Sequence, residues 1–283
     1  MYGTVMIILF RYFNYSLSRN GKEEKHGDSF EKDYLTDLLS NDSVTYIEQQ
    51  SKSSKPFFMM VSTPAPHEPW TFKPEYANLY KNITAPRDND QWNVHKEDAH
   101  WVVRNAPNPM SNISVNWADN AFRNRWRTLK SVDDLVANVY NALNRTGLLN
   151  STYIIFSSDH GYHTGQFSLP YDKRHMYEFD IRVPLLIRGP GIAPGSIVQH
   201  PVAAVDLAPS IMDLMNPMFY QAAADHYDGQ SFVPLVSRRP NLTHSDTSTH
   251  PDIWRENILV EYHGEGHLKT LSCPGLGPGV SVS

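Results

Sequence analysis

Apolar and polar positions alternate along this chain in patterns that predict both helices and strands. In residues 33–49 and 116–144, apolar side chains recur every three or four positions, the spacing of a helix with one buried face. Residues 206–215 predict a third, shorter helix. The stripe of the longest helix is formed by Leu129, Val132, Leu135, Val136, Val139, Tyr140 and Leu143.

Continuous apolar runs predict the strands. Such runs occur at 57–61, 152–156, 183–187 and 258–262, and the first three are typical of strands buried on both faces. The order of strands and helices favours an α/β sheet with helices on its faces.

The first residues of the chain predict two further elements. Asn20-Gly21 is a typical hairpin turn. The apolar run at 5–10 predicts a buried strand, because it is too short to cross a membrane. It has no preceding basic residue and no small-residue cleavage site, so it is a poor signal peptide. We therefore expect neither a transmembrane segment nor a signal peptide in this chain.

Composition narrows the class of protein. In 283 residues, 40% are hydrophobic and 19% charged, which excludes a disordered chain, a coiled coil and a collagen-like fibre. The net charge is −5 and no basic tract stands out, so we expect no binding to nucleic acid. The 13 histidines would make the chain more positive at acidic pH.

Cysteine and asparagine give opposite indications of compartment. A single cysteine, Cys273, excludes an internal disulfide and by itself favours the cytosol. Seven Asn-x-Ser/Thr sequons favour a chain that meets the glycosylation machinery, and we give them the greater weight. They begin at Asn14, Asn41, Asn82, Asn112, Asn144, Asn150 and Asn241.

Polar side chains that could carry chemistry follow two of the predicted strands. His67 lies in a proline-rich loop after 57–61, and Asp159 and His160 follow 152–156. Ligands of open α/β sheets bind at the carboxyl ends of strands. The Asp-His pair could offer a carboxylate oxygen and an imidazole nitrogen to a metal, calcium if oxygen donors prevail and zinc if more imidazoles join.

Two more side chains suit an anionic ester. Lys173 could balance negative charge in a transition state, and His67 could protonate a leaving alcohol. Structural explanations exist for each of these residues. An Asp-His-Gly turn is often a loop cap, a single histidine is often a hydrogen-bonded structural residue, and Asp172-Lys173-Arg174 is typical of a solvated turn.

Four long blocks carry a resemblance to a known family. They are KPFFMMVSTPAPHEPW (55–70), NAFRNRWRTLKSVDDLV (120–136), SSDHGYHTGQFSLPYDKRHMYEFDIRVPLLIRGPGI (157–192) and ILVEYHGEG (258–266). With them the chain resembles sulfatases of the alkaline-phosphatase-like superfamily. The type it resembles is the lysosomal N-acetylglucosamine-6-sulfatase, with extracellular heparan endosulfatases as relatives. The resemblance implies a mixed, mostly parallel sheet flanked by helices.

The resemblance also implies a reaction and site residues. Sulfatases hydrolyse sulfate esters with a formylglycine hydrate beside a bound calcium ion. By resemblance, Asp159 and His160 match the downstream pair of calcium ligands, although most sulfatases have Asn in the second place. Lys173 and His67 match the catalytic residues that hold the sulfate and face the leaving oxygen. His163 and Arg174 are expected to bind substrate.

Other residues of the family pattern are absent from residues 1–283. The family's nucleophile comes from Cys or Ser in a Cys-x-Pro-x-Arg motif, but Cys273 stands in Cys-Pro-Gly-Leu-Gly and no Ser-x-Pro-x-Arg occurs. The adjacent aspartates that complete the family's calcium site have no counterpart, since Asp133-Asp134 lies inside the predicted helix. We therefore expect a chain truncated at both ends, without the first strands and the C-terminal subdomain, and with an incomplete calcium site.

The resemblance divides the chain into three segments. Residues 1–55 form an N-terminal hairpin and helix, 56–240 the sulfatase core with the downstream half of the active site, and 241–283 the start of a C-terminal region. The implied enzyme removes 6-O-sulfate from glucosamine residues of heparan or keratan sulfate in the lysosome or secretory pathway. We expect residues 1–283 to be inactive alone.

Two alternatives stay open at this point. The chain could be a non-catalytic protein, a fragment or pseudoenzyme, that binds sulfated glycans. It could also be a metal-dependent phosphoesterase of the same superfamily, although the run 164–178 fits the sulfatases better. The sequence predicts no oligomeric state.

Overall fold

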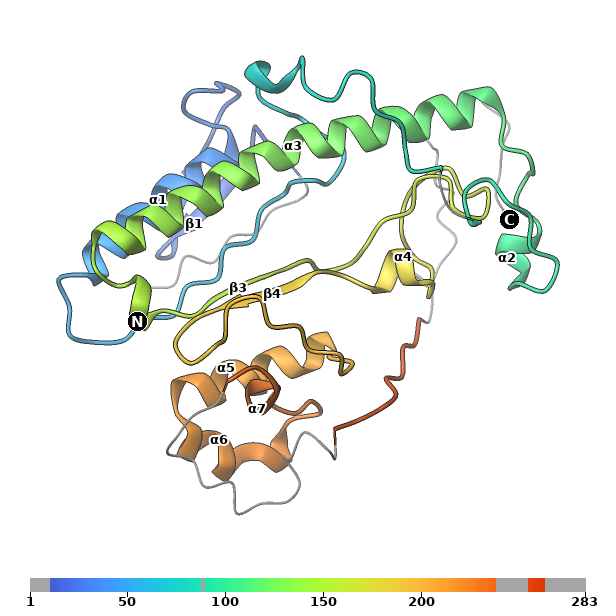
Figure 1. The fold of residues 1–283 in the computed structure, drawn as a ribbon. Coiled ribbons are helices and arrows are strands. Elements are labelled where there is room, and N and C mark those ends of the chain that lie inside the picture. Colours follow the sequence, from blue (N-terminus) through green and yellow to red (C-terminus); the bar gives the residue numbers. More distant parts are fainter. Residues whose placement is uncertain (1–10, 88–89, 238–253, 263–283) are drawn as a thin grey trace.

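The computed structural model describes residues 11–87, 90–237 and 254–262. The strand predicted at 5–10, the sequon at Asn241 and Cys273 lie outside the described residues. Two long helices, α1 (Leu35–Gln50) and α3 (Asn112–Arg145), lie side by side (Figure 1). The helix predicted at 33–49 is confirmed, and the one predicted at 116–144 begins four residues earlier, at Asn112. There Ser111 caps the helix by accepting the Ser114 backbone N–H at 3.2 Å.

The apolar stripe of α3 packs against α1. Ile47 of α1 and Ala142, Leu143 and Leu149 form one buried cluster. A hairpin of β1 (Ser16–Arg19) and β2 (Lys22–Lys25) covers the start of α1. Its turn residues Asn20 and Gly21 both have positive φ, as a two-residue hairpin turn requires, so the predicted hairpin is confirmed.

The second strand pair is antiparallel. It is formed by β3 (Ile154–Ser157) and β4 (Leu185–Arg188), close to the runs predicted at 152–156 and 183–187. The mixed α/β class is confirmed by the fold. Both strand pairs among the described residues are antiparallel, so the parallel part of the expected sheet is not among them.

Two strand predictions were wrong. Residues 57–61 are extended but have no strand partner in the described part of the chain, and residues 258–262 do not form a strand either. Phe57 and Met59 pack on the cluster around Ile47, whereas Phe58 and Met60 are 54% and 79% exposed. The alternation indicates a strand conformation, but a ladder needs a neighbouring strand to supply its hydrogen bonds.

The remaining helices are short. They are α2 (Trp101–Arg104), α4 (Glu178–Ile181), α5 (Leu207–Met215), α6 (Pro217–Ala223) and α7 (Val233–Val236), with 3₁₀ turns at Pro74–Tyr76, Leu149–Ser151, Ala204–Asp206 and Ala224–His226. The helix predicted at 206–215 is confirmed as α5. Helices α5, α6 and α7 gather on the side of the β3–β4 pair away from α1 and α3 (Figure 1).

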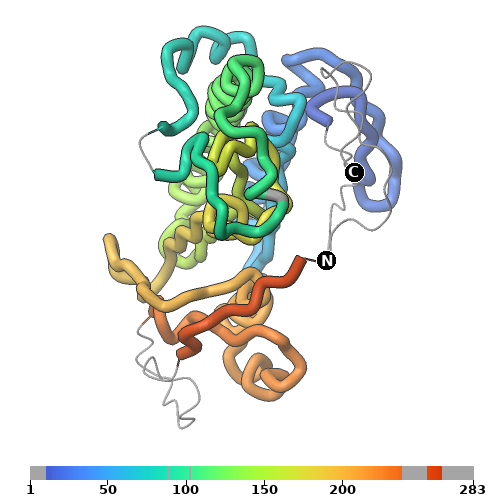
Figure 2. Tube along the Cα trace, turned by 90° about the vertical axis from the view of Figure 1, so that its right-hand side faces the viewer, coloured from blue at the N-terminus to red at the C-terminus, as the bar shows by residue number. Residues whose placement is uncertain are grey.

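A buried carboxylate ties this helical group together. Asp206 is fully buried and accepts the backbone N–H groups of Ala203 (2.8 Å) and Gln230 (3.0 Å). It also accepts the Arg255 guanidinium at 2.5 Å. The Trp254 indole N–H reaches the carbonyl oxygen of Pro201 at 2.7 Å. These bonds anchor the start of segment 254–262 to the group, and the rest of the segment (red in Figure 2) runs away from helices α5–α7.

Among the described helices, none combines the length and the apolar character that a membrane crossing requires.

Candidate active site

Three loops that carry the predicted site residues meet beside α3. We call them the His67 loop (residues 63–70), the Asp159 loop (158–162) and the Lys173 loop (163–175). The ring of Trp117 on α3 lies between Trp70, with centroids 5.7 Å apart, and Tyr171, 5.5 Å apart. One helix therefore brings the His67 loop and the Lys173 loop together.

Arg125, two turns further along α3, joins the His67 loop to the Asp159 loop. Its Nη1 donates to the Pro66 carbonyl oxygen at 3.1 Å, and its guanidinium carbon lies 3.8 Å from the centroid of the Tyr162 ring. Burial lowers the pKa of Arg125, while Tyr162, Tyr12 and Asp159 oppose that shift. The half-buried Arg125 guanidinium, with a carboxylate of the Asp159 loop in electrostatic range, adds positive charge at the junction of the loops.

Sequence reasoning missed Arg125, although a signal was present. Arg125 stands four and seven residues before Leu129 and Val132, on the apolar stripe of the helix. A charge on the buried face of a helix is costly unless it has partners. That position could have marked Arg125 as a residue with a specific contact.

The His67 loop is fixed through its backbone. The His67 N–H donates to Pro64 at 2.7 Å, and the Tyr12 hydroxyl donates to the His67 carbonyl oxygen at 2.8 Å. The ring nitrogen Nδ1 lies 2.8 Å from the Glu68 carbonyl oxygen. Because a carbonyl only accepts, Nδ1 carries the hydrogen, and proton transfer to a leaving group would use Nε2. The neutral ring then has its lone pair on Nε2, so the predicted proton donation requires the doubly protonated ring.

In the Asp159 loop, the two predicted metal ligands face each other. His160 Nδ1 lies 2.7 Å from the Gly161 carbonyl oxygen, so Nδ1 is the donor and a neutral ring has its lone pair on Nε2. That Nε2 lies 3.2 Å from Asp159 Oδ2. Two acceptor atoms at this distance need a proton or a cation between them, which fits a shared metal.

Gly161 allows the Asp159 loop to lie directly on α4. Its N–H donates to the Asp180 carbonyl oxygen at 2.7 Å, and a Cβ at this position would collide with the Phe179 carbonyl oxygen. Glycine is therefore required for the close approach that positions Asp159 and His160.

The pair alone does not make a calcium site. Calcium takes six to eight oxygen ligands. Within residues 11–87, 90–237 and 254–262, no three His, Cys, Asp or Glu side chains cluster closely enough to hold a metal ion. Asp159 and His160 fit as two donors of a site whose other donors are not among the described residues.

Lys173 stands between two strained residues. Asp172 and Arg174 have φ angles of +110° and +99°, a region that side-chain-bearing residues rarely adopt. Lys173 is half-buried, and its ammonium group has no hydrogen bond or ion pair with any described residue. Arg174 is exposed, with Nη1 3.7 Å from Asp172 Oδ2. Strain of this kind clusters at functional sites.

His163, the first residue of the Lys173 loop, is buried at the base of the loop. Its side chain is 3% exposed, and its Nδ1 lies 3.0 Å from Asp180 Oδ1. His175 and Phe179 pack against its ring. In this structure His163 is therefore buried at the base of the loop, and the substrate contact predicted for it stays a prediction. Asp180, like Arg125, was not predicted from the sequence as a site residue.

The sequons lie at the surface. All six within the described residues have exposed asparagines: Asn14, Asn41, Asn82, Asn112, Asn144 and Asn150. A glycan could be attached at each without unfolding the chain.

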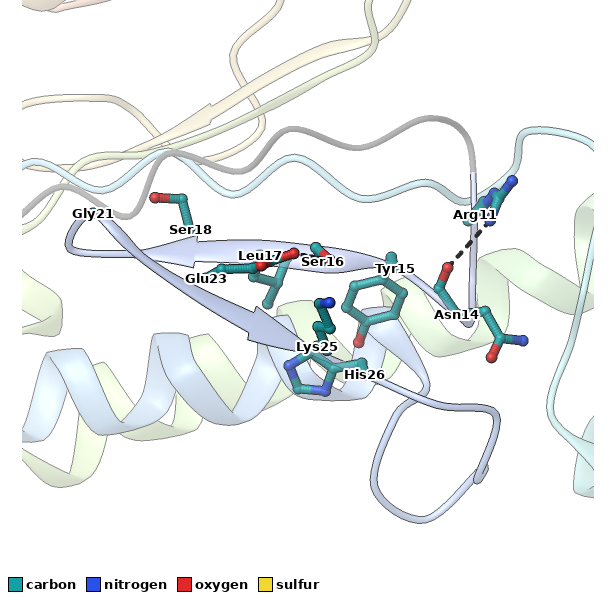
Figure 3. A pocket seen from close by; sticks show the side chains of 10 residues that line it. All are labelled: Arg11, Asn14, Tyr15, Ser16, Leu17, Ser18, Gly21, Glu23, Lys25 and His26. Carbon is teal, nitrogen blue, oxygen red and sulfur yellow. Dashed lines mark hydrogen bonds between the residues drawn. The ribbon is translucent and has the colours of Figure 1, made fainter.

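A cavity of about 660 Å³ lies against the hairpin, apart from the three loops (Figure 3). Residues between Arg11 and His26 line it, and the Arg11 guanidinium donates to the Asn14 carbonyl oxygen across one end at 3.3 Å. No predicted catalytic or metal-binding residue lines this cavity.

Comparison with known proteins identifies the family. Residues 9–217 match the family model described as Sulfatase. The chain belongs to the sulfatase family. It is 51% identical over 272 residues to the N-acetylglucosamine-6-sulfatase of Bos taurus, which covers 96% of this chain and 46% of that protein. The human N-acetylglucosamine-6-sulfatase is 50% identical, covering 96% and 47%. The chain thus spans slightly under half the length of these curated relatives.

The chain is also similar to a more distant sulfatase and, in fold, to two solved structures. The extracellular sulfatase SULF-1 homolog of Drosophila melanogaster is 38% identical over 92% of this chain and 22% of its own length. A Bacteroides thetaiotaomicron structure from a locus for glycosaminoglycan metabolism aligns with a TM-score of 0.59 and 21% identity over 80% and 43% of the two chains. The phosphonate monoester hydrolase of Agrobacterium radiobacter gives 0.55 and 21% over 76% and 45%. These two structures show the shared fold alone.

Proposed function

We propose that this chain carries the sulfate-binding side of the active site of a sulfuric ester hydrolase. Its substrate would be the 6-O-sulfate ester of N-acetylglucosamine residues in heparan or keratan sulfate. The observation that carries the proposal is the half-buried Lys173 ammonium, which has no partner among the described residues and is held between two strained residues of a sulfatase-family chain. The named relatives at about 50% identity support the choice of sugar.

Five of the predicted residues have a role in this proposal. Lys173 balances the charge of the bound sulfate, with Arg174 beside it at the exposed edge of the loop. His67 donates a proton from Nε2 to the departing sugar oxygen. Asp159 and His160 supply two donors to a calcium ion, which would neutralise charge on the sulfate when bound.

The proposed compartment is the lysosome or the secretory pathway, and the chain would be a glycoprotein. Six exposed sequon asparagines and relatives that include a sulfatase named extracellular support this assignment. A shift in electrophoretic mobility after treatment of the native protein with an N-glycosidase tests it. An unchanged mobility would contradict it.

A substrate assay tests the proposed function directly. Residues 1–283 contain no Cys-x-Pro-x-Arg or Ser-x-Pro-x-Arg, so we expect no sulfate release from N-acetylglucosamine 6-sulfate in calcium buffer by this chain alone. We do expect it to bind that sugar more tightly than N-acetylglucosamine. Equal binding of both sugars would contradict the proposal, and turnover abolished by Lys173→Ala would contradict the expected inactivity.

A non-catalytic role in binding sulfated glycans is the second candidate. The exposed Arg174 beside Lys173 favours it, because adjacent cations suit a polyanion. Salt-sensitive retention on heparin that is lost in Lys173→Ala and Arg174→Ala, and no selectivity for a 6-sulfated monosaccharide, would support this role. A phosphoesterase is distinguished by preference for a phosphate over a sulfate ester.

A further inference from the structure

Asp180 on α4 is a buried carboxylate at the base of the Lys173 loop. Its side chain is 2% exposed. His163 Nδ1 lies 3.0 Å from Oδ1 and 3.2 Å from Oδ2, and the His175 backbone N–H donates to Oδ2 at 2.9 Å. A carboxylate only accepts, so both groups are donors.

These two donors come from the first and the last residue of the Lys173 loop. One carboxylate therefore closes the loop across its base. Two backbone bonds reinforce the closure: His163 N–H donates to the Asp172 carbonyl oxygen at 2.9 Å, and Tyr162 N–H donates to Phe179 at 2.8 Å. The loop is thus anchored at its base and at Asp172, immediately before Lys173.

The loop needs such anchors because its backbone is strained. Besides Asp172 and Arg174, Phe167 and Ser168 also have positive φ, at +51° and +61°. Residues in such conformations persist only where surrounding contacts determine them. Bonds from a buried charge are stronger than bonds between neutral groups, so Asp180 is the contact best able to hold this conformation.

We propose that Asp180 is a positioning residue that, through His163 and His175, holds the Lys173 loop in the conformation that presents the Lys173 ammonium group. The presentation of that group to a sulfate ester rests on the proposed function. The positioning of the loop does not, and it can be measured without a sugar.

Limited trypsin digestion of residues 1–283 measures the positioning directly, because the loop contains the cleavable bonds after Lys173 and Arg174. We expect Asp180→Asn to raise the cleavage rate at these two bonds at least about tenfold. Asp206→Asn is the matched control, since Asp206 is also a buried carboxylate that accepts backbone N–H groups, here from Ala203 and Gln230, but in the α5–α7 group. An unchanged rate in folded Asp180→Asn would overturn the proposal, as would an equal increase in Asp206→Asn.

A pair of substitutions at His163 separates the hydrogen bond from ring packing. His163→Asn keeps a donor near the position of Nδ1, whereas His163→Phe keeps a ring and loses the donor. We expect His163→Phe to be cleaved about as fast as Asp180→Asn and His163→Asn to stay close to the unsubstituted chain. The reverse order would overturn the proposal, and this pair decides the matter if Asp180→Asn does not fold.

Affinity for N-acetylglucosamine 6-sulfate tests whether Asp180 acts through Lys173. We expect Asp180→Asn to weaken binding about tenfold in the unsubstituted chain and to have no effect in a Lys173→Ala background. Equal weakening in both backgrounds would overturn the coupling to Lys173. If the unsubstituted chain binds no sulfated sugar while the trypsin result holds, the proposed function fails and the positioning by Asp180 stands.

Discussion

Asp180 and Asp206 are both buried carboxylates that accept backbone N–H groups, yet they organise two very different regions. Asp206 pairs with the permanently charged Arg255 and holds the α5–α7 group, where no described residue between 203 and 237 other than glycine has positive φ. Asp180 pairs with His163 and holds a loop with four such residues. A buried carboxylate thus stabilises the unstrained α5–α7 group in one region and maintains the strained Lys173 loop in the other.

The difference indicates what each region is for. Backbone strain lowers stability, so it is retained where a side chain must be presented in one geometry. The relaxed region presents no candidate chemistry, whereas the strained one presents Lys173. Four substitutions test this contrast, and they follow from the largest expected effect to the smallest.

Asp206→Ala has the largest expected effect on stability. It leaves the Arg255 charge and two backbone N–H groups without their acceptor, so we expect the free energy of unfolding to fall by about 3 kcal/mol. Urea denaturation followed by circular dichroism measures this change. A loss below about 1 kcal/mol would show that Asp206 does not hold the α5–α7 group.

Lys173→Ala has the largest expected effect on ligand affinity. Losing one charge-assisted hydrogen bond of about 1.5–3 kcal/mol weakens binding of N-acetylglucosamine 6-sulfate roughly 10- to 100-fold. Stability should stay nearly constant, because Lys173 contacts no described polar partner. Lys22→Ala, an exposed lysine of the hairpin, is the control. Equal weakening by both substitutions would mean that only net charge matters.

Arg125→Lys has a moderate expected effect, because lysine keeps the charge but loses the planar group. The bond to Pro66 and the stacking on Tyr162 are both lost, and we expect a stability loss of about 1–2 kcal/mol. Arg182→Lys, in an exposed ion pair with Glu178, is the control and should leave the midpoint of thermal unfolding unchanged. Matching melting curves for the unsubstituted chain, Arg125→Lys and Arg182→Lys would show that the contacts of Arg125 do not stabilise the fold.

His175→Gln should change mainly the dependence of stability on pH. Burial lowers the pKa of His175 below its ordinary value of 6.5, and His163 acts in the same direction. The folded chain then binds fewer protons at this residue than the unfolded chain, so stability falls as pH drops from about 7 through 6.5 toward the lowered pKa. The His175 backbone N–H still reaches Asp180 in the variant, which should therefore lose less stability between pH 7 and pH 5. Parallel pH profiles of thermal unfolding would contradict this.

The sequence predicted the parts of the fold that depend on local periodicity. The stripes of α1 and α3, the Asn20-Gly21 turn and α5 each follow from neighbouring residues in the chain. Residues 57–61 and 258–262 were wrongly predicted as strands, because ladder formation depends on a distant partner that no local pattern reveals.

The candidate site was predicted in part. His67, Asp159 and His160 follow strand-like runs, Lys173 lies in a charged turn further along, and family resemblance suggested their roles. Their supports could not be predicted in the same way, because each acts across a long sequence separation. Arg125 contacts Pro66, 59 residues away, and Asp180 contacts His163, 17 residues away. Only the position of Arg125 on an apolar stripe hinted at such a contact.

The most direct test of the account is an amide NMR titration of residues 1–283 with N-acetylglucosamine 6-sulfate and, separately, with N-acetylglucosamine. We predict saturable shifts in the His67, Asp159 and Lys173 loops that require the sulfate group and vanish in Lys173→Ala. Shifts confined to the hairpin cavity, or identical shifts with both sugars, would contradict the assignment of a sulfate site to these loops.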